Sequence, residues 1–385
     1  MLVISIQQTE PSFPAFIMDE TMQDDESLWP WLVLHLTPGV GGVRVRHLLE
    51  HFGTVSALTD LSPNDLQAIG WPLRMAQQVC QGVANPWVTV PGFKALQQWA
   101  REPEHHILTP VHPHYPSRFM AILHDPPPVL FAQGDATVLQ RPMVAVVGSR
   151  QPMASNRRLA HDWSAQFAQA DLVVVSGLAQ GIDGAAHRGA LAGQGQTVAV
   201  LGSGLARIYP LAHSPLARDI KSQGGLLLSE FSPDTPPSPG HFPRRNRLVA
   251  ALADVVLVVE AAQKSGSLIT AHLAAEYGKE VMAVPGHPQY SGSTGVNQLI
   301  ASGAGLAATA ADVAAALSDI ALPSLKPTHL TPDQQRLLAA ITFEPIALET
   351  LALEVKQAPE HILVALLELE LAGYIEGVGG RYVRL

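Results

Sequence analysis

The sequence predicts an α/β fold: a Rossmann-like, doubly wound parallel sheet, flanked by a helical N-terminal domain and a C-terminal winged-helix domain. Short, almost wholly apolar runs recur in the middle of the chain about every 25–30 residues, with helical stretches between them. At the end of the chain, three helical segments precede a hairpin that turns at two glycines, which is typical of a winged helix. With 385 residues, the chain is long enough for two or three domains.

The predicted strands of the sheet contain almost no polar residues, as expected where helices cover both faces. These strands are Val144–Val147, Leu172–Val175, Thr197–Leu201, Leu226–Leu228, Val255–Val259 and Val281–Val284. The sequence divides into a flexible acidic tail (1–27), a helical domain (28–105), a proline-rich extended connector (106–140), the Rossmann-like core (141–311), a linker (312–328) and the winged helix (329–385). The last domain is expected to contain helices over about 332–341, 348–355 and 359–371.

Composition narrows the class of protein. Apolar residues make up 47% of the chain and charged residues 15%, which indicates a globular protein. The single cysteine, Cys80, excludes an internal disulfide and a thiolate zinc site, and favours a cytoplasmic protein. The sequence predicts neither a membrane span nor a signal peptide. Four histidines at and near the start of the connector (His105, His106, His112 and His114) lack a ligand pattern, so we expect no metal site.

Taken alone, the net charge of −9 argues against a nucleic-acid-binding protein. However, residues 141–309 hold 13 basic and 10 acidic residues, so the core is net basic and the flanking segments are acidic. The overall charge therefore leaves room for a local basic site in the core.

Most of the predicted strands end in glycine or a small polar residue. Gly148-Ser149-Arg150 follows the first strand, and Ser176-Gly177 leads into Gly181 after the second. Ligands of doubly wound sheets lie at this edge, where glycines admit the ligand and helix N-termini attract anions. A single such turn is adequately explained by tight βα geometry, but their repetition favours a phosphate site. The P-loop, dinucleotide and nucleophile-elbow motifs are absent.

Two further segments extend this prediction. His241–Arg247 places three arginines, Asn246 and Phe242 at the start of a helix, a combination suited to a nucleic-acid backbone and its bases. Phe242 alone is equally compatible with a place in the core. In Lys264–Thr270, capping explains Ser265 or Ser267, whereas Lys264 is suited to a phosphate.

These segments resemble the DprA family, also called Smf, of bacterial DNA-processing proteins. The matching motifs are VAVVGSR, VVVSGLAQGIDGAAH, LGSG…IYP, LLLSE, HFPRRNRLVAAL, VLVVEA…SGSLITA and VMAVPG…STGVNQLIASGA. The resemblance implies a homodimer formed through the core that binds and protects incoming single-stranded DNA. It further implies that the protein loads RecA recombinase onto DNA coated by single-strand-binding protein during natural transformation. It implies neither catalytic turnover nor a cofactor.

The resemblance also implies a nucleic-acid-binding set of residues. The set comprises Gly148, Ser149, Arg150, Ser176, Gly177, Gly181, Phe242, Arg244, Arg245, Asn246, Arg247, Lys264, Ser265, Gly266 and Ser267. The sequence departs from the family pattern at Gln151–Asn156 and around His213.

The flanking domains allow different interpretations. Pro38–Gly42 resembles one half of a helix-hairpin-helix, in which Arg44 and Arg46 would suit a phosphate; a sterile-alpha-motif-like packing module explains the turn equally well. The predicted recognition helix of the winged-helix domain contains three glutamates (Glu360, Glu368 and Glu370) and no Lys or Arg. A major-groove helix needs donors and positive charge, so we expect this domain to contact protein, or its own chain, rather than DNA.

Two other functions are compatible with a sheet of this kind. One is a nucleoside-monophosphate phosphoribohydrolase of the lysine-decarboxylase-like proteins, although the turn Pro285-Gly286-His287-Pro288 lacks the glutamate of that family's motif. The other is a structural adaptor with no ligand at the glycine-rich edge.

Overall fold

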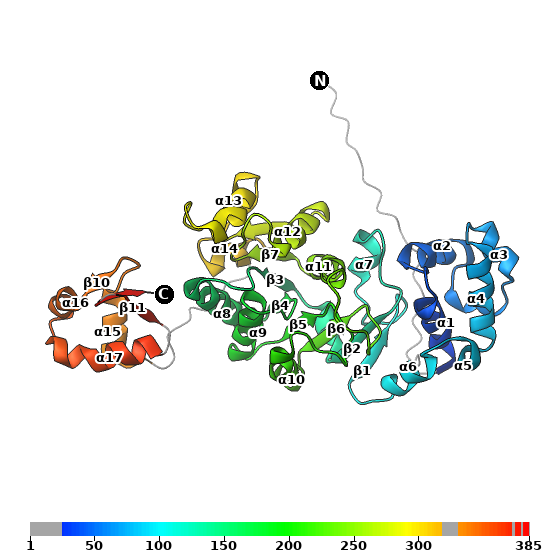
Figure 1. Cartoon of the computed structure of the whole chain (residues 1–385), viewed down its shortest axis with the longest axis horizontal. Coiled ribbons are helices and arrows are strands. Elements are labelled where there is room, and N and C mark those ends of the chain that lie inside the picture. Colours follow the sequence, from blue (N-terminus) through cyan, green and yellow to red (C-terminus); the bar gives the residue numbers. More distant parts are fainter. Residues whose placement is uncertain (1–24, 318–329, 372–373, 379, 385) are drawn as a thin grey trace, which may run out of the picture.

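The structure is a computed structural model that describes residues 25–317, 330–371, 374–378 and 380–384. Along the chain lie a helical N-terminal domain, a central sheet covered by helices, and a small C-terminal domain (Figure 1). Within these residues, no helix is long and apolar enough to cross a membrane.

The N-terminal domain is entirely helical. Its elements are α1 (Asp25–Leu36), α2 (Gly42–Phe52), the 3₁₀ turn η1 (Val55–Thr59), α3 (Pro63–Ala68), α4 (Leu73–Ala84), α5 (Pro86–Thr89) and α6 (Phe93–Ala100). Local signals explain several of these boundaries. For example, Ser62 and Asp65 form a capping box at the start of α3, with proline in the first turn.

The central domain alternates strands and helices. Its strands are β1 (His105–Leu108), β2 (Leu130–Gly134), β3 (Met143–Val147), β4 (Val173–Ser176), β5 (Thr197–Val200), β6 (Leu226–Ser229), β7 (Val255–Val258), β8 (Glu280–Ala283) and β9 (Gly305–Leu306). Its α-helices are α7 (Ser117–Ile122), α8 (Ala154–Gln169), α9 (Ile182–Ala192), α10 (Ser214–Ser222), α11 (His241–Leu252), α12 (Gly266–Glu276), α13 (Thr294–Ala301) and α14 (Ala310–Ala315). Short 3₁₀ turns are η2 (Ala136–Gln140), η3 (Leu211–His213) and η4 (Ser291–Ser293).

The nine strands form one sheet in the order β1-β2-β6-β5-β4-β3-β7-β8-β9. The pairs from β6 to β9 are parallel, whereas β2 pairs antiparallel with β6 and with β1. The chain moves outward from β3 to β6 and then returns to place β7 on the other side of β3. This reversal is the topological switch of a doubly wound sheet, which confirms the predicted fold class.

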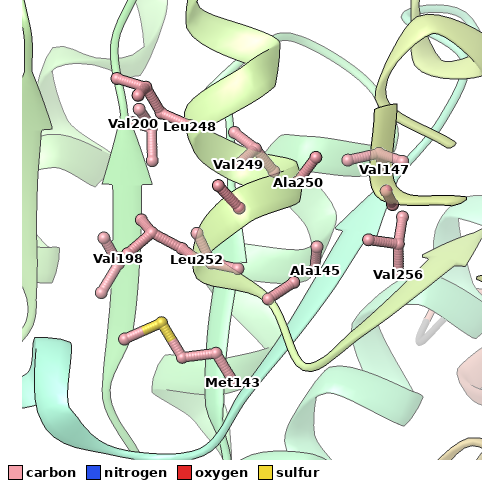
Figure 2. Close-up of a cluster of buried hydrophobic side chains, with 14 of the residues drawn as sticks. Met143, Ala145, Val147, Val198, Val200, Leu248, Val249, Ala250, Leu252 and Val256 are labelled. Carbon is pink, nitrogen blue, oxygen red and sulfur yellow. The ribbon is translucent and has the colours of Figure 1, made fainter. Parts of the chain in front are cut away.

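The core lies on both faces of the sheet because successive side chains of a strand point to opposite sides. Met143, Ala145 and Val147 of β3 pack against α11, as Figure 2 shows, with Leu248 and Leu252 from the helix. The intervening β3 residues, Val144 and Val146, belong to a second cluster with α8 and α9. All five strand residues are buried, as expected for a strand covered on both faces.

Three predicted boundaries need correction. Helix α1 begins at Asp25, within the predicted tail; residues 1–24 lie outside the described part of the chain. The predicted connector contributes most of β1, the helix α7 and the strand β2, and thus two strands of the main sheet. The many prolines of this segment favoured an extended connector, so the sequence did not indicate these short elements. The core also extends into the predicted linker, because α14 packs Val313 into the sheet's second cluster; residues 318–329 are outside the described chain.

The C-terminal domain agrees with the predicted winged-helix pattern. It contains α15 (Pro332–Ala340), β10 (Ile346–Ala347), α16 (Leu348–Val355), α17 (Pro359–Leu371), β11 (Ile375–Val378) and β12 (Arg381–Arg384). The three strands form a separate sheet in the order β10-β12-β11. A capping box between Thr331 and Gln334 starts α15, and the three helices pack around a separate apolar cluster.

Candidate functional site

A pocket of about 630 Å³ opens at the carboxyl ends of β3 and β4, between the N-termini of α11 and α12. This is the edge of the sheet at which the sequence predicts a ligand. We call it the strand-edge pocket. Its lining consists of Val147, Gly148, Arg150, Gly177, Ala179, Asp183, Tyr209, Pro239, Phe242, Pro243, Arg245, Asn246, Val249, Ser265, Gly266, Ser267, Ile269 and Thr270.

One wall of the strand-edge pocket combines a cation with two aromatic rings. The Arg150 guanidinium carbon lies 5.5 Å from the centre of the Phe242 ring, and Phe242 lies 5.7 Å from the Tyr209 ring. Phe242 is half-buried and also lines a smaller adjoining pocket, so it is neither a core residue nor a fully exposed one. Arg150 and Tyr209 are exposed. Such a wall offers a flat surface for a base beside a positive charge for a phosphate.

The floor of the pocket contains a buried pair of opposite charges. Arg245 is 5% exposed, and its Nη1 donates to the carbonyl of Val200 across 2.5 Å. Asp183 accepts hydrogen bonds from the amides of Gly177 (3.2 Å) and Ala179 (3.4 Å). Burial raises the pKa of the Asp183 carboxyl, and the positive charge of Arg245 opposes that rise.

Arg245 is therefore a supporting residue more than a free phosphate clamp. Its guanidinium fills the space beside Gly177, where any side chain would overlap it. Arg245 Nε has no hydrogen-bond partner within the described residues, and burial lowers the pKa of this arginine. Arg245 nevertheless lines the pocket, so the expectation that it contacts nucleic acid stays a prediction.

The N-terminus of α12 forms another side of the pocket. The Ser265 hydroxyl caps the helix by accepting from the Ser267 amide (3.3 Å), so capping explains this serine. Asn246 donates from Nδ2 to the Gly266 carbonyl (3.2 Å), which ties α11 to α12 at the pocket. Lys264 is exposed immediately before the cap, outside the lining set.

Arg244 and Arg247 do not line the strand-edge pocket, so the structure does not bring them together with the other predicted binding residues. Arg247 donates from Nη2 to Glu230 Oε2 (2.5 Å) and from Nη1 to the Asp125 carbonyl (2.8 Å). Arg244 pairs with the same Glu230 oxygen (3.1 Å) and remains 52% exposed. The reason is helical geometry: residues 242, 245, 246 and 249 share the face of α11 that lines the pocket, whereas 244 and 247 lie on another face.

Three of the predicted glycine-loop residues shape the loops without lining the pocket. Ser149 donates its amide to the Glu260 carbonyl (2.7 Å), and the buried Ser176 donates its hydroxyl to the Val146 carbonyl (2.6 Å). Gly181 has φ +80°, and a side chain there would overlap the Ser149 carbonyl. Glycine at 181 thus allows the two loops to meet below the pocket.

The N-terminal hairpin and the start of α2 pack against residues 120–125. The amide of Val43, at the start of α2, donates to Asp125 Oδ1 (3.2 Å), and Arg46 donates to the carbonyls of Met120 (3.0 Å) and Leu123 (2.8 Å). Arg44 donates to the Gly39 carbonyl within the hairpin (2.6 Å). These contacts favour the packing-module interpretation over a phosphate-binding hairpin.

Two of the four histidines near the start of the predicted connector form structural contacts. His105 bonds to the Trp99 carbonyl (2.8 Å), and His106 bonds to the Gly134 carbonyl (3.0 Å). Among the described residues, no group of three His, Cys, Asp or Glu side chains is arranged to hold a metal ion.

Sequence reasoning missed several lining residues. Tyr209 is the most informative of them, because it is 47% exposed and precedes a cis proline, Pro210. A signal was present: the motif after the third predicted strand ends in Ile208-Tyr209-Pro210. Ile269, which is 41% exposed, and the buried Asp183 were also missed, and only the fold brings them to the same pocket.

The fold and the site together define a class of protein: a Rossmann-like core with a cationic, aromatic pocket at its carboxyl edge, joined to a C-terminal winged helix. Residues 106–318 match the family "DNA recombination-mediator protein A", and residues 321–381 match the "DprA winged helix domain". The chain belongs to the DNA recombination-mediator protein A (DprA/Smf) family.

Relatives with this architecture match over much of the chain. "Protein Smf" of Escherichia coli (strain K12) is 37% identical over 353 residues, covering 89% of this chain and 91% of the relative. The X-ray structure of DNA processing protein A from Streptococcus pneumoniae superposes with a TM-score of 0.64 at 33% identity, covering 74% of this chain and 97% of that one. DNA processing protein A from Helicobacter pylori, whose structure is described in terms of its single-stranded DNA binding mode, gives a TM-score of 0.51 at 33% identity and covers 57% and 98%.

Proposed function

We propose that this protein binds single-stranded DNA in the strand-edge pocket, without reading its sequence. The observation that carries the proposal is the wall formed by Arg150, Phe242 and Tyr209, because it pairs a cation with aromatic surfaces. The single-stranded DNA binding described for the Helicobacter pylori relative supports the same assignment.

Each part of the pocket has a proposed task. Arg150 neutralises a phosphate, and Lys264 together with the N-terminal end of α12 adds positive potential at the rim. Phe242 and Tyr209 stack bases, an interaction that every base can make. The buried residues Arg245 and Asp183 stabilise the backbone at the base of the pocket. Binding that depends on phosphates and stacking should be sensitive to salt and tolerant of sequence.

We further propose that the role is non-catalytic. In this proposal a homodimer formed through the core protects incoming single-stranded DNA in the cytoplasm and loads RecA recombinase onto strands coated by single-strand-binding protein, as in natural transformation. Family membership and the net positive charge of the core support it. The phosphoribohydrolase alternative has no comparable support, because the turn after β8 reads Pro285-Gly286-His287-Pro288 and lacks the glutamate.

A titration of fluorescent oligothymidine followed by anisotropy tests the binding proposal. Phe242→Ala should weaken binding by roughly tenfold through the lost stacking. Arg157→Ala is the control for a substitution outside the pocket. Arg157 is exposed on α8 and is not among the lining residues, so this variant should leave the affinity unchanged. Equal affinity of wild type and Phe242→Ala at two salt concentrations would contradict the proposal. Release of free base from AMP by the wild type would contradict the non-catalytic role.

A further inference from the structure

The outward face of α17 in the winged-helix domain is apolar. Leu363, Val364 and Leu367 are 44%, 64% and 56% exposed, although side chains of this type are ordinarily buried. Ile362 and Leu366, on the opposite side of the same helix, fill the domain's own core. The exposed residues are therefore surplus to the folding of this domain. We call Leu363, Val364 and Leu367 the α17 ridge.

A shallow groove continues the α17 ridge toward α15. It has a volume of about 220 Å³, and its apolar lining residues include Val364 of the ridge together with Leu337, Val355 and Ala365. The other lining residues are mostly polar or charged, among them Asp333 and Arg336. The groove is large enough for one or two side chains of an incoming segment. The ridge spans about one turn of α17, and together with the groove it forms a surface that a helix can contact.

Acidic side chains predominate around this surface, although Arg336 and His361 also line the groove. Helix α17 contains Glu360, Glu368 and Glu370 and no Lys or Arg, and the described part of the domain holds eight acidic and four basic residues. Two of these carboxylates are held in place: Glu368 accepts from the Gln334 amide (2.7 Å), and Glu370 accepts from the Gly377 backbone amide (3.0 Å). Hydrogen bonds thus fix the positions of the negative charges of Glu368 and Glu370 on the ridge helix.

This combination selects among possible occupants. A DNA duplex and an anionic membrane would both bring negative charge to these glutamates. A second copy of α17 would place glutamates against glutamates. A basic, amphipathic helix satisfies both features, because its apolar stripe covers the ridge while its Lys or Arg residues meet the glutamates.

We propose that the α17 ridge is a docking surface for a basic amphipathic helix of a partner protein. Apolar residues at helical spacing contact Leu363, Val364 and Leu367, and one of them enters the groove beside α15. Basic residues on either side pair with Glu360 and Glu368. The proposal does not depend on the strand-edge pocket or on its ligand.

The test uses the full-length protein labelled with ¹³C at Leu and Val methyl groups. The probe is a synthetic helical peptide of about 18 residues with Leu at helical spacing and Lys elsewhere, and its counterpart has Glu in place of Lys. We expect the Lys peptide to shift the methyl signals of Leu363, Val364 and Leu367 selectively. It should bind about tenfold more tightly than the Glu peptide.

Two variants locate the binding surface. Leu367→Lys should weaken the Lys peptide by about tenfold, because it places a like charge on the ridge. Leu353→Lys is the matched control: Leu353 is 79% exposed in the same domain but belongs to α16, and this variant should bind the peptide as the wild type does. Both positions are at the surface, so thermal unfolding of both variants should match that of the wild type.

Several results would overturn the proposal. These are equal affinity for the two peptides, shifts spread over other domains, or the same loss of affinity in both variants. Self-association that Leu367→Lys abolishes would make a second copy the occupant. If duplex DNA changes the chemical shifts of the ridge methyl groups, the α17 ridge is a DNA-binding surface.

Discussion

Arg247 reaches Glu230 across 2.5 Å, and the two side chains are only 14% and 2% exposed. Glu230 follows β6, whereas Arg247 belongs to α11, the helix that also provides Phe242 and Asn246 to the strand-edge pocket. Arg247 in turn bonds to the Asp125 carbonyl, and the Asp125 side chain accepts from the first turn of α2. One face of α11 thus lines the site while another fastens the N-terminal domain.

Loss of Arg247 should destabilise the protein. Arg247→Ala leaves the Glu230 carboxylate buried with only the half-exposed Arg244 beside it. Breaking a buried pair in this way costs on the order of 3 kcal/mol. We expect a lower midpoint of urea unfolding than in Arg157→Ala, which removes an exposed arginine. Equal midpoints for the two variants would show that the Glu230 pair contributes little.

Loss of Arg245 should also act through stability. Arg245→Ala removes the charge facing Asp183 and empties the space beside Gly177 under the pocket. We expect this variant to unfold at a lower temperature than Phe242→Ala, in addition to binding DNA more weakly. A normal unfolding temperature combined with weak binding would instead support the direct phosphate contact that the sequence suggested.

Protonation of His35 should weaken the fold in mild acid. Burial, with the nearby charge of Arg244, lowers the pKa of His35 from 6.5 to about 4. Because the folded-state pKa is below the unfolded-state value, this contribution is complete above pH 6.5 and is lost progressively as the pH falls toward 4.

The test compares unfolding free energies of wild type and His35→Gln between pH 6.5 and 4.5. In the wild type, protonation of His35 makes the unfolding free energy fall by about 1 kcal/mol for each pH unit of acidification. This part of the pH dependence should be absent from His35→Gln, because glutamine does not titrate. The comparison cancels the contributions of other buried groups, such as Asp183 and Glu230. His47→Gln, at an exposed position of α2, is the control. An unchanged slope in His35→Gln would contradict the assignment.

Salt dependence should identify the phosphate contacts. Arg150 is the exposed arginine of the pocket wall, so Arg150→Ala should reduce the log–log slope of affinity against salt by about 0.7. Phe242→Ala should weaken binding with little change in that slope, because stacking releases no counterions. If both variants alter the slope equally, the division of tasks between cation and ring is wrong.

The sequence predicted the parallel strands β3 to β8 well because their apolar runs differ clearly from their surroundings. It missed β1 and β2, which lie among prolines and pair antiparallel at one end of the sheet. It also missed β9, which has only two residues. The edge of the sheet that holds the pocket was also predictable, since glycine-terminated parallel strands all end there.

The directions of side chains were harder to predict. The segment 241–247 was treated as one cluster, yet helical spacing alone separates Phe242 and Asn246 from Arg244 and Arg247. Which of these faces meets the pocket depends on Glu230 and Asp125, which are far away in sequence. For the same reason, the burial of Arg245 follows from the packed sheet and not from any local pattern.

The most direct test of the central claim is photo-crosslinking of the wild-type protein to oligothymidine in which 5-iodouracil replaces some thymines, followed by mass spectrometry. If single-stranded DNA lies in the strand-edge pocket, the adducts will fall on Phe242 and Tyr209, the two rings of its wall. Adducts confined to the N-terminal hairpin or to α17, with none on these two residues, would contradict it.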